Sequence, residues 1–597
     1  MVKNEKTETK AVPAIGREQI AQAREVLGRY RAGKSPTDLR VLDNRRFMNA
    51  RIKGRPTGEG EAPRVVSAWL FNCIENKLAD MMDNFPEPNV LPREESDRDE
   101  ARSLSSIIPV VLDSCDFEET YRAGCSEKLR CGTAVYGVFW DARKAGGLGD
   151  VDVRLVGLPN FFAEPGVTDL QASRSVFTVE YIDRDLLKEE YPALGDAERA
   201  SGAFQDAGTG SGEDKAEVVS WYYKKRQNGR QVLHFCKFTG DTVLYATENE
   251  TEPVRAPDGS VIAPAPAESG LYDHGLYPFV VDSFIECGEG IWGAGLIDLG
   301  SSAQEWIDRG NSALLKSMTV NAGPRFFVKA NAEINKEEFA DLRNDIVTFT
   351  GSDPASSVMP IVAQPVSGVY LSILQSKIGE LKETTGNRDV TSGGAPAGVT
   401  AASAIAAMQE AAGKNSRAIN KQTYRAYKKI VLFIIELIRQ FYDVPRRFRI
   451  TGRRADLYAG GETPPDGYSF ISYTNAGLKN GIENGYRLPQ MDVEVTAQKQ
   501  SVYSKMSQNE FALQLYSAGF FAPAMKEAAL KALEMMDFER KEFVVDLVAQ
   551  GVGETDDAQA APFADAGGRA VPGVRRREET RLMRTVRQKV REAPSPK

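Results

Sequence analysis

The chain has 597 residues, of which 42% are hydrophobic and 26% charged, and a formal net charge of −8. This composition is typical of a soluble globular protein with several domains. No apolar run approaches the roughly 20 residues of a membrane-spanning helix, and the polar N-terminus MVKNEKTETK lacks the apolar core of a secretory signal.

Cysteine and histidine are scarce, which limits the chemistry that the chain could perform. The six cysteines form no C-x-x-C pair, and the only histidines are His234 and His274. This pattern favours a reduced intracellular compartment and argues against a zinc site. It also leaves few of the nucleophile–base pairs that covalent catalysis needs. We therefore expect no metal, no cofactor and no enzymatic activity.

The chain is predicted to begin with helices. Residues 1–64 combine a polar start, a short helix at Arg17–Tyr30 and basic, glycine-rich sequence. Regular apolar spacing then predicts helices over Val65–Asn84 and Asp97–Arg130. Pro109 lies inside the second of these, and we expect it to break or kink the helix because proline donates no backbone hydrogen bond.

A β-rich region follows. Thr133–Asp141 and Val151–Pro159 flank a glycine-rich turn and are predicted to form a hairpin. Asn228 and Gly229 mark a second hairpin turn. The other elements expected before residue 288 are the helix Arg184–Tyr191 and the strands Val176–Ile182, Val218–Tyr223, Val232–Phe238, Thr242–Tyr245 and Phe279–Cys287.

Residues 288–442 show the most informative order of elements. Apolar spacing predicts a helix over Leu296–Asn321, which Pro324 ends, and a second helix over roughly Val369–Thr385. Between them lies an insertion that is too long for a simple connection. It is predicted to contain the strands Arg325–Lys329 and Ile346–Thr350 on either side of a helical piece, Asn335–Arg343.

A flexible loop and a very long helix complete this region. Gly386–Val399 is rich in Gly, Ser, Asn and Pro, which prevents a regular element. Ala401–Tyr442 contains no proline, so a helix of about 60 Å could form there. Two helices with a folded piece at their tip and a loop beside them suit the wall of a tube better than an enzyme pocket.

The C-terminal part returns to strands and then to helices. Strands are expected at Phe448–Thr451, Tyr468–Tyr473 and Met491–Val495, and helices at Tyr503–Ala518, Pro523–Met536 and Glu539–Gln550. Residues 551–597 are predicted to be disordered. Their last part, Arg569–Lys597, holds ten Lys/Arg against three Glu, so the rest of the chain is acidic.

Two glycine motifs match nucleotide-binding patterns in unfavourable contexts. Gly28–Ser35 fits G-x-x-x-x-G-K-[ST], but a helix precedes it where the phosphate-binding loop requires a strand. Gly288–Gly293 fits G-x-G-x-x-G, but no alternation of strands and helices follows it. A helix-end loop and a flexible hinge, respectively, are the favoured interpretations.

Six short segments, taken in their order, resemble portal proteins of tailed bacteriophages. The similarity covers roughly residues 20–550. The segments are Gly132–Asp141 (GTAVYGVFWD), Val156–Phe162 (VGLPNFF), Gly290–Gly293 (GIWG), Gln304–Asn311 (QEWIDRGN), Asn321–Pro324 (NAGP) and Gly393–Ser403 (GGAPAGVTAAS).

The resemblance implies an α+β portal fold with a mixed α/β wing, a two-helix stem, a small α/β clip, a long wing helix and a helical crown. The implied parts are an N-terminal segment (1–64), wing (65–287), first stem helix (288–324), clip (325–366), second stem helix (367–385), channel loop (386–400), long wing helix (401–442), remaining wing (443–500), helical crown (501–550) and disordered basic tail (551–597).

The resemblance also implies a role without catalysis. The family forms a dodecameric ring at one capsid vertex, through which the terminase motor packages DNA that later leaves into the tail. The implied partners are further copies of the chain, double-stranded DNA, the terminase large subunit, the major capsid or scaffolding protein and a head–tail adaptor, with no membrane. The implied location is the portal vertex of the virion, after assembly in the host bacterial cytoplasm.

Three groups of site residues follow from the resemblance. Those expected in the channel loop, near DNA, are Asn387, Arg388, Asp389, Thr391, Ser392, Gly393 and Gly394. Those expected at the interface between stems are Gln304, Trp306, Ile307, Arg309 and Leu314. Those expected on the clip, facing the terminase or the adaptor, are Lys336, Glu337, Glu338 and Arg343.

The long helix carries a basic stripe of Arg417, Lys421, Arg425, Lys428 and Lys429. We expect this stripe to pair with acidic wing residues of a neighbouring subunit, with contact to DNA phosphates as the alternative. Two other functions remain open. One is a nucleotide-binding packaging ATPase, based on Gly28–Ser35, and the other is a structural scaffold without a channel.

Overall fold

The structure is a computed structural model of the chain. It describes residues 14–52, 66–192, 215–387, 414–451, 468–478, 490–499 and 526–534 and the single residues 514, 517 and 548, with gaps in the third range at 228, 256–260, 289, 323–324, 329–334, 342–345, 351–357 and 362–367. Chain contacts separate Met1–Ser501 from Val502–Lys597. In the second unit the main described element is α15 (Lys526–Glu534), which lies inside a predicted helix. The other two helices predicted there, apart from these single residues, and the basic tail lie outside the described residues.

Two antiparallel sheets form most of the β structure in the first unit. The five-stranded sheet has the order β4 (Phe161–Ala163), β5 (Ser175–Asp183), β6 (Lys215–Gln227), β7 (Arg230–Thr239) and β8 (Thr242–Ala246). The three-stranded sheet has the order β11 (Phe279–Ser283), β2 (Thr133–Asp141) and β3 (Asp150–Val156). The α+β class and the hairpin predicted between residues 133 and 159 are therefore confirmed.

Helices cover these sheets and bury the core. They are α1 (Arg17–Ile52), α2 (Trp69–Asp83), α3 (Arg98–Ser114), α4 (Phe117–Cys131) and α11 (Lys414–Phe441). Helices α4 and α11 pack on the three-stranded sheet in the main core. A second core joins α1 to the five-stranded sheet, with Ile20 and Leu27 against Phe177 and Phe238. We call the described elements of residues 14–294 and 414–499 the body.

Several small elements complete the description. They are β1 (Asn84–Pro92), α5 (Arg184–Glu190), β9 (Val254–Arg255), β10 (Val261–Ala263), α6 (Pro266–Ser269), β12 (Ile285–Glu286), β13 (Gly293–Ala294), β16 (Arg446–Thr451), β17 (Tyr468–Tyr473) and β18 (Met491–Lys499). Strand β1 pairs with β18, and β16 pairs with β17.

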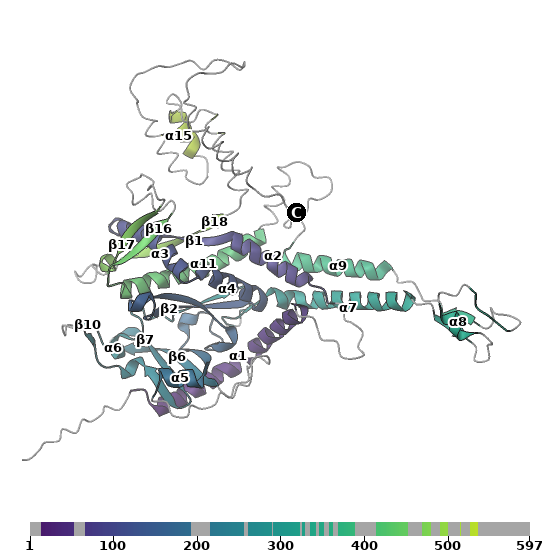
Figure 1. The fold of residues 1–597 in the computed structure, drawn as a ribbon. Helices are drawn as coiled ribbons and strands as arrows, with labels where there is room; N and C mark the ends of the chain where they lie inside the picture. Colours follow the sequence, from purple (N-terminus) through teal and green to yellow (C-terminus); the bar gives the residue numbers. More distant parts are fainter. Residues whose placement is uncertain are drawn as a thin grey trace, which may run out of the picture. The chain divides into compact units, whose positions relative to one another are not determined.

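Two long helices form an antiparallel hairpin. These are α7 (Leu296–Ala322) and α9 (Gly368–Thr385), which run side by side in Figure 1. Both match the helices predicted from apolar spacing. Between them in sequence lie β14 (Arg325–Val328), α8 (Lys336–Ala340) and β15 (Val358–Ile361).

The N-terminal helix is much longer than predicted. Instead of ending at Tyr30, α1 continues through Gly33 and Pro36 to Ile52. Its inward face keeps a spacing of three and four residues, but some of the inward positions are polar, such as Lys34 and Asp38. Because these two form an ion pair of 2.8 Å with each other, the helix can bury them.

Two further predictions are wrong. Pro109 lies inside α3 without ending it, and the break falls at Cys115–Asp116, where Asp116 has a positive φ of 51°. In the insertion, the predicted strand Ile346–Thr350 does not form, since its only ladder residue is Phe349, and β14 pairs with β15 instead. Strand β1 was not predicted at all, because its partner β18 is about 400 residues away in the sequence.

A half-buried histidine lies where the body's loop before β11 meets α11, and it predicts a dependence of stability on pH. The ring of His274 packs between Tyr272 and Phe433, and its Nδ1 accepts a hydrogen bond from the Leu276 N–H over 3.0 Å. Burial, reinforced by the nearby Arg439 and Lys224, lowers the pKa of His274 to about 4. The folded protein therefore keeps this ring neutral at pH values where an unfolded chain would protonate it.

As the pH falls from about 6.5 to 4, we expect the protein to lose about 2 kcal/mol of unfolding free energy through His274. The sign follows because only the unfolded state takes up a proton in this window. His274→Asn keeps an acceptor for the Leu276 N–H but does not titrate. Urea unfolding at pH 7 and pH 4.5 should give a smaller pH-dependent loss in this variant, and equal losses in both proteins would contradict the assignment.

Candidate functional site

The α7–α9 hairpin is held together by close approach at two glycines. A Cβ at Gly300 would lie 3.0 Å from Leu381 Cδ1 and 2.8 Å from Leu70 Cδ1, so α7 meets α9 and α2 at this point. Further along, a Cβ at Gly310 would lie 3.4 Å from Leu374 Cδ1. Because the positions on α7 rise as those on α9 fall, the two helices are antiparallel. A side chain at Gly300 would force Leu70 or Leu381 to shift, whereas a Cβ at Gly310 would make an ordinary van der Waals contact.

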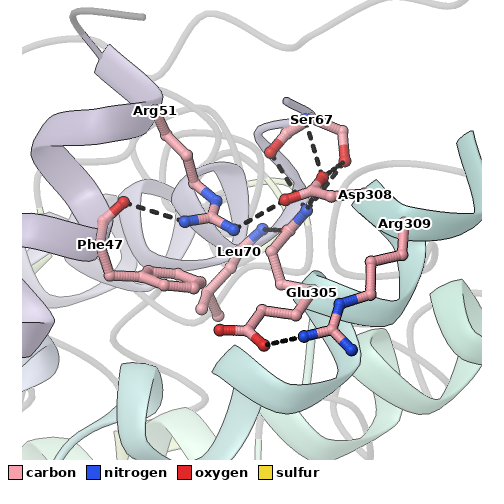
Figure 2. Close-up of polar contacts among 8 residues, drawn as sticks. Phe47, Arg51, Ser67, Leu70, Glu305, Asp308 and Arg309 are labelled. Atoms are coloured by element: carbon pink, nitrogen blue, oxygen red, sulfur yellow. Dashed lines mark hydrogen bonds and ion pairs between the residues drawn. The ribbon is translucent and has the colours of Figure 1, made fainter. Parts of the chain in front are cut away.

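The middle of α7 is fixed to the body by a network of hydrogen bonds around Asp308 (Figure 2). Asp308 Oδ2 accepts a bond of 2.7 Å from Arg51 at the end of α1. Asp308 Oδ1 accepts bonds from the Ser67 N–H and Oγ and from Gln304 Nε2, at 2.9, 2.7 and 3.0 Å. Gln304 Oε1 in turn accepts the Leu70 N–H at 2.9 Å, at the start of α2. One carboxylate therefore joins α1 and the start of α2 to α7.

Removing this carboxylate should loosen the hairpin from the body. Asp308→Ala leaves the Arg51 guanidinium, whose side chain is 8% exposed, without its partner, and we expect a loss of about 3 kcal/mol of unfolding free energy. Hydrogen exchange should increase near Phe47–Arg51 and Ser67. Glu305→Ala is the matched control, because the half-exposed Glu305 pairs with the exposed Arg309 at 3.5 Å and has only a weaker coulombic effect on Arg51, after Asp308, so it should change stability by at most about 0.5 kcal/mol. Equal losses in both variants would contradict the role of the network.

The α7–α9 hairpin also exposes large apolar side chains. On α7 these are Trp306, Leu315 and Met318, and on α9 they are Val369, Tyr370, Leu371 and Ile373, with exposed fractions from 45% to 64%. Trp306 and Leu315 are nine residues apart, which puts them on opposite sides of α7 at about 100° per residue. On α9, Tyr370, Leu371 and Ile373 point in three different directions for the same reason. Surfaces of this kind mark interaction sites, and this one extends over more than one side of the hairpin.

The structure separates the five predicted stem residues into two groups. Trp306 is 59% exposed, and Arg309 is also exposed and lies over its ring at 5.9 Å. Leu314 is half-buried. Gln304 and Ile307, in contrast, are completely buried within the protomer. Gln304 serves the Asp308 network instead, and Ile307 belongs to the main core.

Only one predicted loop residue is described. Asn387 follows α9 directly and is 8% exposed, with its side chain 3.5 Å from Cys73 Sγ and from Asn76 Nδ2 on α2. This burial does not fit a side chain that faces DNA. The other loop residues lie outside the described part of the chain: Arg388, Asp389, Thr391, Ser392, Gly393 and Gly394.

The predicted clip residues lie on and around α8. The Asn335 side chain caps this helix by accepting the N–H groups of Glu337 and Glu338. Glu338 also accepts hydrogen bonds from the backbone and hydroxyl of Thr348, and these bonds lower the pKa of its carboxyl group. Lys336 opens the helix, and Arg343 lies outside the described residues.

Neither glycine motif has the geometry of a nucleotide site. Gly28–Ser35 lies inside α1, where Lys34 is 3% exposed and its Nζ binds Asp38 and the Leu158 carbonyl. The same ammonium group lies 4.7 Å from the ring of Phe162. This lysine is therefore committed to the core and cannot reach a phosphate.

The second motif, Gly288–Gly293, connects β12 to β13 as a hairpin and does not join a strand to a helix. Gly293 packs tightly here, since its N–H binds Thr133 Oγ1 and its carbonyl binds Arg40. It is neither a dinucleotide loop nor the predicted flexible hinge.

The exposed apolar residues of α9 were missed by the sequence analysis. Apolar spacing predicted the helix but not the exposure of its first turn, where Leu371 is 52% exposed. The available signal was the run Val369–Ile373, in which four of five residues are apolar. Such a run covers most directions around a helix, so a single protein core cannot bury all of it.

Within the described residues, no helix combines the length and the apolar character that a membrane span needs. Nor do three or more His, Cys, Asp or Glu side chains gather there in a way that could hold a metal ion.

Comparison with known proteins identifies one family. No curated protein matches the chain. The model of the phage P22-like portal protein family, in contrast, matches residues 72–256 and 278–570, which together are most of the chain. The second stretch includes the whole α7–α9 hairpin and the insertion between its helices. The chain therefore belongs to the family of phage P22-like portal proteins.

Proposed function

We propose that copies of this chain close into a ring whose α7–α9 hairpins form the wall of a channel for double-stranded DNA. In this proposal α7 and α9 are the stem, the insertion with α8 is the clip, and the body is the wing. The genome enters through the ring during packaging by a terminase motor and later leaves through it into the tail. The ring occupies one vertex of the capsid and performs no catalytic step itself.

The observation that carries this proposal is the exposure of apolar side chains on more than one side of the hairpin. A symmetric dimer would cover one patch with its own copy and leave the opposite side bare. A ring places a different neighbour on each side, because its contacts run head to tail and close on themselves. Trp306 on one side of α7 and Leu315 on the other fit such an arrangement.

The remaining assignments depend on position within this ring. The clip, with Lys336, Glu337, Glu338 and Arg343, is the proposed docking surface for the terminase large subunit and the head–tail adaptor. Residues 386–400 form the proposed channel loop. The body is the proposed contact for the capsid or scaffolding protein. A duplex moves through such a channel only if few phosphates are gripped, since each ion pair with a phosphate adds affinity.

Imaging and mass measurement of the purified full-length chain test the proposal. Electron micrographs should show rings with a central hole wide enough for duplex DNA, and native mass spectrometry should give one closed assembly of about twelve copies. Monomers, open filaments or solid particles at micromolar concentration would support the scaffold alternative and contradict the channel.

A further inference from the structure

The body contains an acidic groove that the functions described above do not use. Its volume is about 520 Å³, and it lies between the end of α2, strand β1 and the junction of α3 with α4. Five carboxylates and one basic residue, Arg122, line it together with apolar and proline side chains. The carboxylates are Glu87, Asp113, Asp116, Glu118 and Glu119.

The groove is suited to long basic side chains. Phe85, Leu112 and Phe117 form part of its lining and could pack against the methylene stems of lysine or arginine. The carboxylates at the rim would meet the charged ends. Asp113, Asp116, Glu118 and Glu119 are exposed, and within the described part of the chain none of these four forms an ion pair.

A complementary surface lies on α11. Lys421, Arg425 and Lys428 are exposed and follow one another at spacings of four and three residues, so they share one face of the helix over about 10 Å. Within the described residues Lys421 and Arg425 have no ion-pair partner, and Lys428 forms none within 4.0 Å, although its charge helps to lower the pKa of Asp492 on β18. These three residues, without Arg417 and Lys429 of the longer basic stripe, are called the α11 stripe.

The stripe and the groove face different sides of the protomer. Tyr427 belongs to the lining of the groove, and it lies two residues after Arg425, about 200° around α11. Lys421 and Lys428 are also turned at least about 100° from Tyr427, so the stripe points away from the groove of its own chain. A head-to-tail contact between identical copies requires two complementary surfaces that point in different directions.

We propose that the groove of one copy receives the α11 stripe of the next copy, so that this contact sets the direction and register of the ring. The inference rests on the proposed ring and adds to it the surfaces that each body presents to its two neighbours. Like charges brought together at this contact would oppose assembly, whereas opposite charges favour it and exclude the reverse orientation.

Charge reversal on full-length protein tests the proposal. The stripe variant is Lys421→Glu with Arg425→Glu, and the groove variant is Asp113→Lys with Glu119→Lys. Asp113 ends α3 and Glu119 begins α4, so the effects of the two substitutions on the helix dipoles should roughly cancel. Each variant alone should need at least about ten times more protein to form rings than the unmodified chain.

Mixing the two variants gives the decisive result. The groove of the stripe variant is still acidic and the stripe of the groove variant is still basic, while the altered groove, with three basic side chains against three carboxylates, no longer has the net negative charge that would repel the altered stripe. An equimolar mixture should therefore form rings again, with the two variants in alternation. Nitrogen-15 labelling of one variant lets native mass spectrometry count them, and equal numbers are expected.

A matched control carries the same change of charge elsewhere on the body. Arg143→Glu with Arg174→Glu alters two arginines whose side chains are 86% and 87% exposed, and it should leave ring formation unchanged. If the stripe and groove variants form rings as readily as this control, the proposed contact is wrong, while the proposed ring itself is still supported.

If the mixture does not restore rings, another occupant fills the groove, such as the basic segment Arg569–Lys597, and the proposal is overturned. If the unmodified chain forms no ring, the proposed function and this inference are both wrong.

Discussion

Lys128→Ala is expected to destabilise the protein by about 4 kcal/mol. Lys128 on α4 is completely buried, and its Nζ lies 2.6 Å from Asp282 Oδ1 on β11 and 2.8 Å from Thr423 Oγ1 on α11. Lys128 therefore joins α4 to strand β11 through the ion pair and to α11 through the hydrogen bond. Without the lysine, the carboxylate of Asp282, which is 1% exposed, has lost its counter-charge.

The loss should also depend on pH. Burial raises the pKa of Asp282, and Lys128 opposes this rise. In Lys128→Ala the rise is unopposed, so the folded variant holds a proton that its unfolded chain releases above pH 4. The variant should therefore lose stability as the pH increases from 4 to 8, relative to the unmodified protein. Urea unfolding at these two pH values measures the difference.

Two further variants separate burial from simple charge loss. Lys128→Met with Asp282→Asn removes both charges together and should recover part of the lost stability, because no charge remains buried. Lys144→Ala breaks an ion pair of similar length with Asp152, but this pair is about one third exposed and its loss should matter far less. A loss in Lys128→Ala no greater than in Lys144→Ala would contradict the argument.

Local apolar periodicity was sufficient to locate much of this fold. The helices α7 and α9 and the hairpin of β2 and β3 have regular patterns of apolar residues, and each appears within a few residues of its predicted bounds. Local patterns failed where distant parts of the chain decide the outcome. Strand β1 exists because β18 pairs with it, and nothing near residue 84 contains that information.

Helix α1 shows a second cause of failure. Lys34, Asp38 and Asn44 are polar residues at buried, inward positions beyond Tyr30, where an apolar face would have to continue. Each is satisfied by a polar partner, as in the bond of 2.8 Å from Asn44 to Asp298. In the sequence alone, a polar residue at an inward position indicates that the apolar face of the helix has ended, because its partner in the fold is not visible there. The helix was therefore predicted to stop near Tyr30.

The candidate interface was only partly predictable for a related reason. Spacing placed Gln304, Trp306 and Ile307 near one another on α7, but it could not say which of them the body buries. That depends on Ser67 and Leu70, which reach Gln304 from more than 230 residues away in the sequence. Conversely, the exposure of Tyr370 and Ile373 follows from how little of α9 the body covers. Only the described structure gives this information.

Trp306→Asp combined with Tyr370→Asp is expected to abolish ring formation without unfolding the protomer. Both side chains are about 60% exposed in the protomer, so their replacement should change its unfolding free energy by less than about 1 kcal/mol. In the proposed ring each is buried against a neighbour. A lost apolar contact and a buried unpaired carboxylate should each cost about 2 kcal/mol or more per interface.

The ring multiplies this cost. Every interface in a closed assembly of identical copies carries the same substitutions, so the penalty is repeated around the ring and no intact contact remains to compensate. We therefore expect the double variant to be monomeric at micromolar concentration by native mass spectrometry and light scattering. Circular dichroism and urea unfolding should remain those of the unmodified chain under conditions that keep it dissociated.

Leu186→Asp provides the matched control for this experiment. Leu186 on α5 is 60% exposed, as apolar as the hairpin residues and distant from them in the sequence, and it should tolerate a carboxylate without loss of rings. Because both variants place a carboxylate at an exposed apolar residue, a difference between them reflects where the residue lies and not the kind of substitution. Should the double variant of α7 and α9 still close into rings while the Leu186 variant does not, the wall of the channel is not built from these two helices.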